Sequence, residues 1–370
     1  MKYLYQEGFT QNREISWLRF NERVLEEAAD LSVPPLERLR FIAICQSNLE
    51  EFYRVRVGSL MAQKASGDTT PDIRSGWTPS RQLEEISREL APVLRRRDLL
   101  YTQTIEALAA SGIRHARAED LTREERRRFA RQLLQGPERL KPVILHGFRE
   151  LPEPETGKVC QISLLPSDSG LYIGFLPVPE VLPSYYVLES GEEGVRIIQT
   201  AELLRAVVSE LYVPFEPSAS CLIRIERSAE FPDVDEDDLP ADSKLRMKTL
   251  LKGRAAQHAV LLETDLPLPD MAAEALSDRF GIPEEQITCA GSLLGLDYAY
   301  ALEKDLPEGI RKQVCFRPHQ PRNRYPETDG RMMDLVRRRD LLLSFPYDSF
   351  EPLIRLLEEA AEDPQAREIR

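Results

Sequence analysis

Apolar residues in the first 110 positions recur three and four positions apart, the spacing of a helix with one buried face. The run "SWLRFNERVLEEAAD" predicts a first helix, which Pro34-Pro35 is expected to end. Residues 81–111 predict a long helix, and Pro92 inside it predicts a kink or a division into two helices. Residues 67–80 are rich in Gly, Pro, Ser and Thr and predict a loop. The face of the first helix expected to be buried consists of Trp17, Phe20, Val24, Leu25 and Ala28.

The pattern changes further along the chain. Thr122-x-x-Glu125 has the form of a capping box and predicts a helix over 122–134. From about residue 140, short β-prone runs alternate with turn signals and helical segments. This alternation predicts an α+β domain with a mainly antiparallel sheet and helices on one side. The expected strands are 158–165, 170–176, 185–190, 194–199, 221–226 and 259–264, and the expected helices are 200–210, 243–256 and 269–280.

The last part of the chain predicts a third domain. Residues 316–330 have the composition of a linker, "DLLLSF" (340–345) predicts a buried strand, and "EPLIRLLEEAAED" predicts an amphipathic helix with Leu353, Ile354 and Leu357 on one face. A strand and helix of this kind are normally followed by a second, parallel strand. We therefore expect this domain to be incomplete. The expected organisation is an all-α domain at 1–112, an α+β domain at 113–318, and a linker with the start of a third domain at 319–370.

Composition limits the classes of function. The chain has 370 residues, of which 42% are hydrophobic and 30% charged, as in ordinary globular proteins. A net charge of −13 argues against non-specific binding to nucleic acid or to an anionic membrane. Five cysteines without CxxC spacing predict a reducing, cytoplasmic setting, and no apolar stretch predicts a membrane-spanning segment.

The sequence lacks the common motifs for phosphate-binding loops, zinc proteases and serine hydrolases. Three arginine triplets stand out in an acidic chain, at 95–97, 126–128 and 337–339. Since successive helical residues point in different directions, most of each triplet is expected to be solvated. Arg54 and Arg56 lie closer to Asn48 and are better placed to meet phosphate if that segment lines a site. The four histidines, none at metal-ligand spacing, are His115, His146, His258 and His319.

A polar pair interrupts the apolar run of residues 36–58. Ser47-x-x-Glu50 has the form of a capping box, which predicts a helix beginning at Ser47. The pattern leaves Asn48 unexplained. Its carboxamide carries donors and an acceptor that suit either a purine edge or a phosphate oxygen.

Two long blocks resemble polyphosphate kinase, the family that makes inorganic polyphosphate from ATP by way of a phosphohistidine. They are "NREISWLRFNERVLEEAAD…VPPLERLRFIAICQSNLEEFYRVRVGSL" (12–60) and "RRRDLLLSFPYDSFEPLIRLLEEAAEDP" (337–364), and "IRIERSAEF" (223–231) is a weaker match. The likeness to the family's SNLDEF motif implies that Asn48 contacts ATP. Arg54 and Arg56 then become candidates for phosphate contacts. The resemblance also implies that residues 319–370 are the truncated start of an α/β catalytic domain.

The chain departs from the family pattern in places. Glu50 replaces the family's Asp, Ser344 and Phe345 stand where two histidines are typical, and "KPVILHGFRELPEP" replaces a proline-rich stretch. The family's catalytic histidines and Mg²⁺-linked arginines align beyond residue 370, so no catalytic residue and no metal ligand is expected in this chain. The resemblance implies ATP and Mg²⁺ as cofactors, polyphosphate as a partner, and a homo-oligomer formed through the helical domain.

Three hypotheses follow. The first is the N-terminal portion of a polyphosphate kinase-like enzyme, inactive on its own. The second is a non-catalytic binding or scaffold protein derived from the same family. The third is an unrelated helical module whose arginine triplets bind acidic partners.

Overall fold

The computed structural model describes residues 10–136, 139–192, 194–229, 258–290, 294–326, 330–366 and 368. The helix expected at 243–256 lies outside these residues. The chain divides into two compact units, Met1–Cys315 and Phe316–Arg370. No helix in the described part of the chain is long and apolar enough to cross a membrane.

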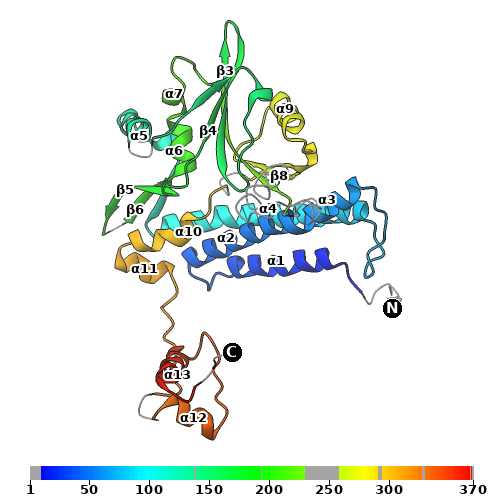
Figure 1. Cartoon of the computed structure of the whole chain (residues 1–370). Helices are drawn as coiled ribbons and strands as arrows, with labels where there is room; N and C mark the ends of the chain where they lie inside the picture. The colour runs from blue at the N-terminus through cyan, green and yellow to red at the C-terminus, as the bar shows by residue number, and fades with distance from the viewer. Residues whose placement is uncertain are drawn as a thin grey trace. The chain divides into compact units, whose positions relative to one another are not determined.

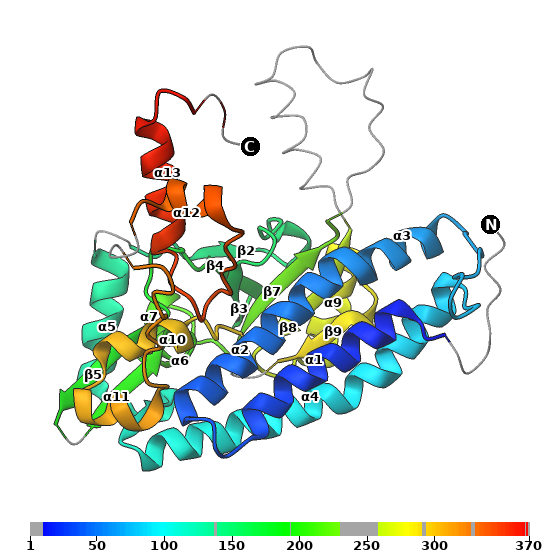
Figure 2. The same ribbon diagram turned by 90° about the horizontal axis from the view of Figure 1, so that it is seen from below.

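The first unit begins with long helices that lie side by side (Figures 1 and 2). The first helix already ends at Ala29, and Pro34 and Pro35 stand at the N-cap and first positions of the second helix, so the expectation that Pro34-Pro35 ends the first helix was wrong. Proline suits the first helical turn because the missing N–H has no partner there. The elements are α1 (Arg13–Ala29), α2 (Pro35–Phe52), a π-helix at Tyr53–Val57, α3 (Gly58–Ala65) and α4 (Pro79–Ala110).

Leu25 and Ala28 of α1 are buried as predicted, and Trp17 and Val24 pack against the core, but the predicted face is wrong at Phe20. Phe20 is 56% exposed, whereas Asn21 is fully buried. Leu18, Asn21 and Leu25 are three and four residues apart and form one stripe, which Phe20 does not share. The prediction followed the apolar side chains and therefore missed a buried amide.

Helix α4 is a single helix of 32 residues with Pro92 inside it, so the chain does not divide there into two helices. Pro92 lies on the exposed side, where it removes one backbone hydrogen bond without displacing a buried side chain. The helix is followed by Gly112 with φ of 90°, a conformation that glycine adopts without strain.

The strands form two mixed sheets rather than one, with order β2-β4-β3-β7-β8-β9 in the larger and β1-β6-β5 in the smaller. Pairing is antiparallel except for β1–β6 and β8–β9, so the mainly antiparallel character was predicted correctly. Their bounds are β1 (Ile113–Ala116), β2 (Val143–Leu145), β3 (Val159–Ser167), β4 (Gly170–Pro177), β5 (Tyr185–Gly191), β6 (Gly194–Gln199), β7 (Ala219–Arg227), β8 (Ala259–Thr264) and β9 (Ile287–Cys289).

Shorter helices connect the strands. The capping box that opens α5 is confirmed, because Thr122 Oγ1 accepts the Glu125 N–H and Glu125 Oε2 accepts the Thr122 N–H. The α-helices are α5 (Arg123–Gln135), α6 (Thr200–Ala206), α7 (Val208–Leu211), α9 (Asp270–Phe280), α10 (Tyr298–Ala301) and α11 (Glu308–Val314). Turns of 3₁₀-helix lie at Ala118–Asp120, Phe148–Glu150, Glu284–Gln286 and Leu302–Asp305.

The long helices and the strands share one hydrophobic core, to which Leu39 of α2, Leu108 of α4 and Ile197 of β6 all belong. In Figure 1 the layer formed by α1, α2 and α4 lies below the strands, and in Figure 2, seen from below, the same helices lie in front of them. The domain boundaries expected near residues 112 and 318 stay predictions.

The second unit contains α12 (Met332–Arg338) and α13 (Glu351–Glu362), so the amphipathic helix near the end of the chain is confirmed. The strand expected at 340–345 was wrong. That segment is irregular, and Leu342 is 74% exposed. A strand needs a partner to satisfy its backbone, and within the described part of this unit the β pairing is one isolated bridge, Arg322–Asp348.

A candidate nucleotide-contacting site on helix α2

Ser47 and Asn48 lie inside α2, not at its start. The Ser47 hydroxyl donates to the carbonyl oxygen of Ile44 at 3.1 Å, one turn earlier. The capping role predicted for Ser47 was therefore wrong. A serine within a helix commonly satisfies its hydroxyl in this way.

Asn48 is held by a buried amide of the neighbouring helix. Its Nδ2 donates to Oδ1 of Asn21 at 3.0 Å, and Asn21 Nδ2 in turn donates to the carbonyl oxygen of Cys45 at 3.1 Å. The same nitrogen lies 3.3 Å from Cys45 Sγ, which stays a neutral thiol because burial raises its pKa to about 12. A polar residue within the apolar stripe of α1 was the signal that could have identified Asn21.

The other polar atom of the Asn48 side chain is its acceptor oxygen, Oδ1. No described residue donates a hydrogen bond to it, and it is not among the solvent-inaccessible polar atoms that lack a partner. The acceptor oxygen of a half-buried amide thus remains accessible at the surface of α2.

The two arginines expected near Asn48 lie in the π-helix and contact different partners. Arg54 Nε is 3.8 Å from Oε2 of Glu226, and Arg56 Nε is 4.0 Å from Oε2 of Glu14. Each side chain is 43% exposed, so both can still reach a ligand. No contact between described residues joins either arginine to Asn48.

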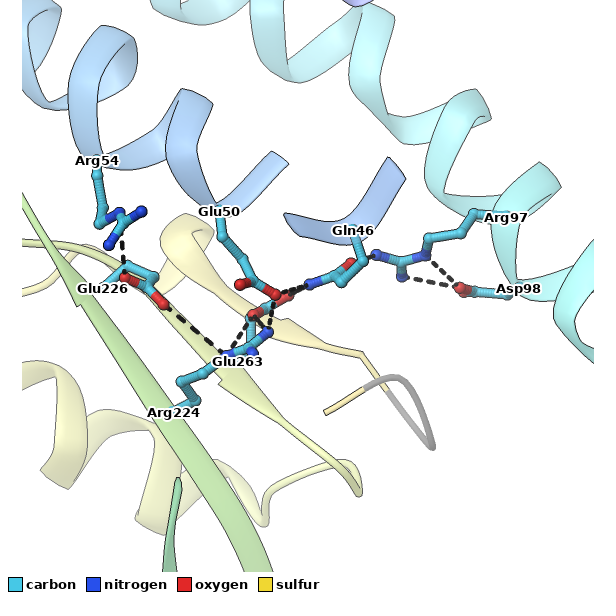
Figure 3. A network of polar contacts seen from close by, with 8 residues as sticks. All are labelled: Gln46, Glu50, Arg54, Arg97, Asp98, Arg224, Glu226 and Glu263. Atoms are coloured by element: carbon cyan, nitrogen blue, oxygen red, sulfur yellow. Dashed lines mark hydrogen bonds and ion pairs between the residues drawn. The ribbon is translucent and has the colours of Figure 1, made fainter. Parts of the chain in front are cut away.

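On the sheet side, α2 enters a buried ionic network (Figure 3). Arg224 of β7 donates from Nη2 to Oε1 of Glu50 at 2.5 Å and to Oε2 of Glu263, on β8, at 2.6 Å. Gln46 Nε2 donates to the same two carboxylates, at 3.0 Å each. These bonds join the helical layer to the larger sheet through charge-assisted contacts.

The network continues to α4 through one member of an arginine triplet. Arg97 is 2% exposed and donates to Oε1 of Gln46 at 2.5 Å and to Asp98 at 2.8 Å, while Arg95 and Arg96 are exposed. Most of this triplet is solvated as expected. Its buried member, Arg97, is hydrogen-bonded within the protein.

Glu226 is the least satisfied carboxylate of the network. It is 2% exposed, and its Oε2 accepts no hydrogen bond from the described residues. Burial raises its pKa to about 7, against the opposing effect of Arg224. Burial also raises the pKa of Glu50, again opposed by Arg224.

The four histidines lie apart. His115 is on β1, and neither of its ring nitrogens, both inaccessible to solvent, has a hydrogen-bond partner among the described residues. Burial lowers its pKa to about 4, so it is neutral at physiological pH. His146, His258 and His319 are exposed.

Mg²⁺ prefers several oxygen ligands at once. Within the described ranges, no three His, Cys, Asp or Glu side chains are grouped to hold a metal ion. The side chains of the described residues therefore form no group that fits a resident Mg²⁺.

The fold and the sequence together define the class of protein. Residues 10–116 match the polyphosphate kinase N-terminal domain, residues 107–302 the middle domain, and residues 331–370 the C-terminal domain 1. The middle-domain match alone covers more than half of the chain. This chain belongs to the polyphosphate kinase family.

Individual relatives agree. Polyphosphate kinase from Halalkalibacterium halodurans is 31% identical over 99% of this chain and 53% of its own length, and that from Bacillus cereus is 28% identical over 98% and 53%. The crystal structure of polyphosphate kinase from Porphyromonas gingivalis superposes with a TM-score of 0.74 at 23% identity, over 97% of this chain and 50% of that one. The chain spans about half the length of the curated relatives it matches.

Proposed function

We propose that this chain forms the N-terminal and middle part of an enzyme that transfers the γ-phosphoryl group of ATP to inorganic polyphosphate through a phosphohistidine. In this part, α2 contributes a nucleotide contact through Asn48. The family membership supports the reaction class. The observation that carries the site is Asn48 itself, whose amide is fixed from behind by Asn21 and presents an accessible oxygen.

Phosphoryl transfer depends mainly on positioning the nucleotide and on stabilising charge. Asn48 would orient the nucleotide, and Arg54 and Arg56 are the candidates for phosphate contacts. Mg²⁺ is expected from the family, but no step is assigned to it on these residues. We further propose that the helical region mediates self-association and that polyphosphate is the acceptor.

The proposal predicts a loss of ATP affinity when the Asn48 amide is removed. Asn48→Ala should weaken ATP binding by about tenfold, the effect of one lost hydrogen bond to a ligand. Isothermal titration of the 370-residue chain with ATP measures this effect. Ser47→Ala is the matched control, because its hydroxyl bonds only to the preceding turn and its loss should leave affinity unchanged.

Unchanged affinity in Asn48→Ala would contradict the assignment.

A second assay, with γ-labelled ATP, tests whether these 370 residues contain the phosphate-accepting nucleophile. We expect no acid-labile phosphoprotein, because none of the four histidines lies in a matching motif. Label on any of them would place a nucleophile inside these residues, whereas ATP binding without label also fits a non-catalytic member of the family.

A further inference from the structure

Helix α5 is strongly basic, although the chain as a whole is acidic. Its 13 residues include five arginines and two glutamates, whereas the chain has a net charge of −13. One of the two glutamates, Glu125, is engaged in the capping box and lies 3.5 Å from Arg196 of β6. Most of the positive charge on α5 is therefore not balanced within the helix.

Three of the five arginines form one stripe along the exposed side of α5. Arg123, Arg127 and Arg131 are four residues apart, so each lies one helical turn beyond the previous one. All three are exposed, and none forms an ion pair with a described residue. Arg131 Nε donates to the carbonyl oxygen of Arg127 at 3.4 Å, which leaves the terminal nitrogens of Arg131 without a partner among the described residues.

This stripe lowers the stability of the helix. Like charges four residues apart repel each other on a helix surface. Arg123 is also the first residue of α5, where the helix dipole favours a negative charge and disfavours a positive one. A bound anion would offset both effects.

Two further cations extend the basic surface beyond the helix. The N–H of Leu140 donates to the carbonyl oxygen of Leu133, in α5, at 2.7 Å. This bond brings the exposed neighbours of Leu140 close to the last turns of the helix, and neither neighbour forms an ion pair with a described residue. The α5 basic surface consists of Arg123, Arg127, Arg131, Arg139 and Lys141.

The other two arginine triplets form no comparable surface. Arg97 of the first triplet is buried. Arg337 of the last triplet lies 3.8 Å from Asp334 and 3.6 Å from Asp363. The α5 basic surface also lies apart from the π-helix, because α5 and α3, which follows the π-helix, are at opposite sides of the first unit in both views (Figures 1 and 2).

We propose that the α5 basic surface binds a chain of inorganic polyphosphate, as an anchoring site separate from the nucleotide contact on α2. This inference rests on the proposed function, in which polyphosphate is the acceptor. Guanidinium groups match phosphate oxygens through paired hydrogen bonds. From Arg123 to Arg131 the stripe extends about 12 Å along the helix axis, a length that several consecutive phosphates of one chain can follow.

Charge density and shape favour polyphosphate over other polyanions. Each of its phosphates is charged and the chain has no bulky groups, whereas a nucleic acid strand adds a sugar and a base at every phosphate. Exposed carboxylates flank the surface, with Glu119 before the helix and Glu124 in its first turn. A thin chain can follow the arginines and avoid these carboxylates. A nucleic acid or an acidic protein would cover them and be repelled.

Removing two charges from the stripe tests the site. Arg127→Gln/Arg131→Gln should bind long-chain polyphosphate about tenfold more weakly than the wild-type chain. Because a bound polyanion releases counterions, the slope of log affinity against log salt should also fall in magnitude by about 1–2. Fluorescence anisotropy of end-labelled polyphosphate at a series of NaCl concentrations measures both quantities.

Arg95→Gln/Arg96→Gln is the matched control. It removes the same charge from two exposed arginines of α4, which as consecutive residues do not line up along one face. The affinity for polyphosphate should change by about twofold or less.

Both double variants should fold. Arg127→Gln/Arg131→Gln removes the repulsion along α5, so its thermal midpoint should equal or exceed that of the wild type. ATP affinity, measured by titration, should be unchanged, because both arginines lie outside the candidate site on α2. A weaker affinity for polyphosphate with intact ATP binding would then place the loss at α5.

A loss confined to Arg127→Gln/Arg131→Gln supports the inference. Equal losses in the two double variants overturn it, because binding then follows overall charge, and so does the absence of loss in both. Oligothymidylate and polyglutamate of matched charge separate the possible partners. If either binds as tightly as polyphosphate and is weakened by the same two substitutions, the assignment to polyphosphate is overturned. If the wild-type chain binds polyphosphate through these arginines but does not bind ATP, the proposed nucleotide contact fails and the α5 site stands.

Discussion

Two buried polar residues on elements next to α2, Asn21 of α1 and Glu226 of β7, differ in their hydrogen bonding. Asn21 and Glu226 are both almost completely removed from solvent, yet they differ in how they are satisfied. Asn21 has a partner for its oxygen and its nitrogen. Glu226 faces Arg54 and Arg224 only at 3.8 and 3.9 Å, and two further carboxylates, Glu50 and Glu263, share the same arginine. Asn21 is therefore suited to holding the Asn48 amide in place. Glu226 is instead a carboxyl group whose protonation state is expected to change near neutral pH.

Glu226→Gln tests this difference through the pH dependence of stability. The carboxyl titrates near 4.5 in the unfolded chain and near 7 in the folded protein. Between these values the folded state binds more protons, so the free energy of unfolding of the wild type falls as pH rises. Glutamine does not ionise, so the free energy of unfolding of Glu226→Gln does not fall in this way. Relative to the wild type, the variant should be equal near pH 4.5 and more stable above pH 7 by on the order of 2–3 kcal/mol.

Urea unfolding at half-unit steps from pH 4.5 to 8 measures the difference for Glu226→Gln. Glu153→Gln is a suitable control, because that carboxylate is 43% exposed, in contrast to the buried Glu226. If the difference in free energy of unfolding between Glu226→Gln and the wild type does not change with pH, Glu226 is already ionised at acid pH in the folded protein.

At the scale of elements, α3 approaches the larger sheet at its first residue, directly after the π-helix. The π-helix separates α2 from α3, and α3 begins at Gly58, which is buried against the end of β7. A Cβ at Gly58 would lie 2.7 Å from Oγ and 3.2 Å from Cα of Ser228. The absent side chain thus permits a close approach of helix and strand.

Gly58→Ala should destabilise the protein by about 1–3 kcal/mol, since the added methyl group must displace backbone as well as a side chain. Gly309, in α11, is the matched control. It is also helical, but nothing lies within 4 Å of its added Cβ, so Gly309→Ala should stabilise the protein by about 0.5–1 kcal/mol. Chemical denaturation of both variants measures whether each substitution lowers or raises the free energy of unfolding. Equal effects would mean that helix propensity alone governs both positions.

Local sequence patterns predicted elements whose causes are local. The Thr122 capping box needs only four consecutive residues, and strands β3, β4, β7 and β8 of the larger sheet follow from short apolar runs bounded by turns. The same local rule failed for Ser47-x-x-Glu50, which lies inside α2, where the Glu50 carboxylate bonds to Arg224, 174 positions away. It failed for residues 340–345 as well, where an apolar run lacks a strand to pair with in the described part of its unit.

At the scale of the molecule, the candidate site depends on contacts that no local pattern contains. Asn48 could be singled out as a polar residue in an apolar run, but its partner Asn21 lies 27 positions earlier. Gln46 and Glu263 are 217 positions apart, and their bond connects the helical layer to the sheet. Arg54 and Arg56, neighbours in the sequence, were expected together and instead contact β7 and α1.

The two units should also differ in stability. The first contains two hydrophobic clusters, one of them extensive, whereas the described core of the second consists of Tyr325, Met332 and Leu335, with a few partly buried leucines around them. Apolar side chains of the second unit are exposed instead, among them Leu342, Phe345, Tyr347, Phe350, Ile354 and Leu357. A small core cannot offset much conformational entropy.

Hydrogen exchange tests this difference within one molecule. Backbone amides of α13 should exchange about a hundredfold faster than those of α2, because opening the second unit breaks far fewer buried contacts. Helix α5 controls for helix length, since it has 13 residues against 12 in α13 but buries Phe129, Ala130 and Leu133 in the core of the first unit. Protection of α13 equal to that of α5 would show that the second unit is stabilised by more than its visible core. Fast exchange in α13 together with slow exchange in α5 would instead show that core size, not helix length, sets the stability of each unit.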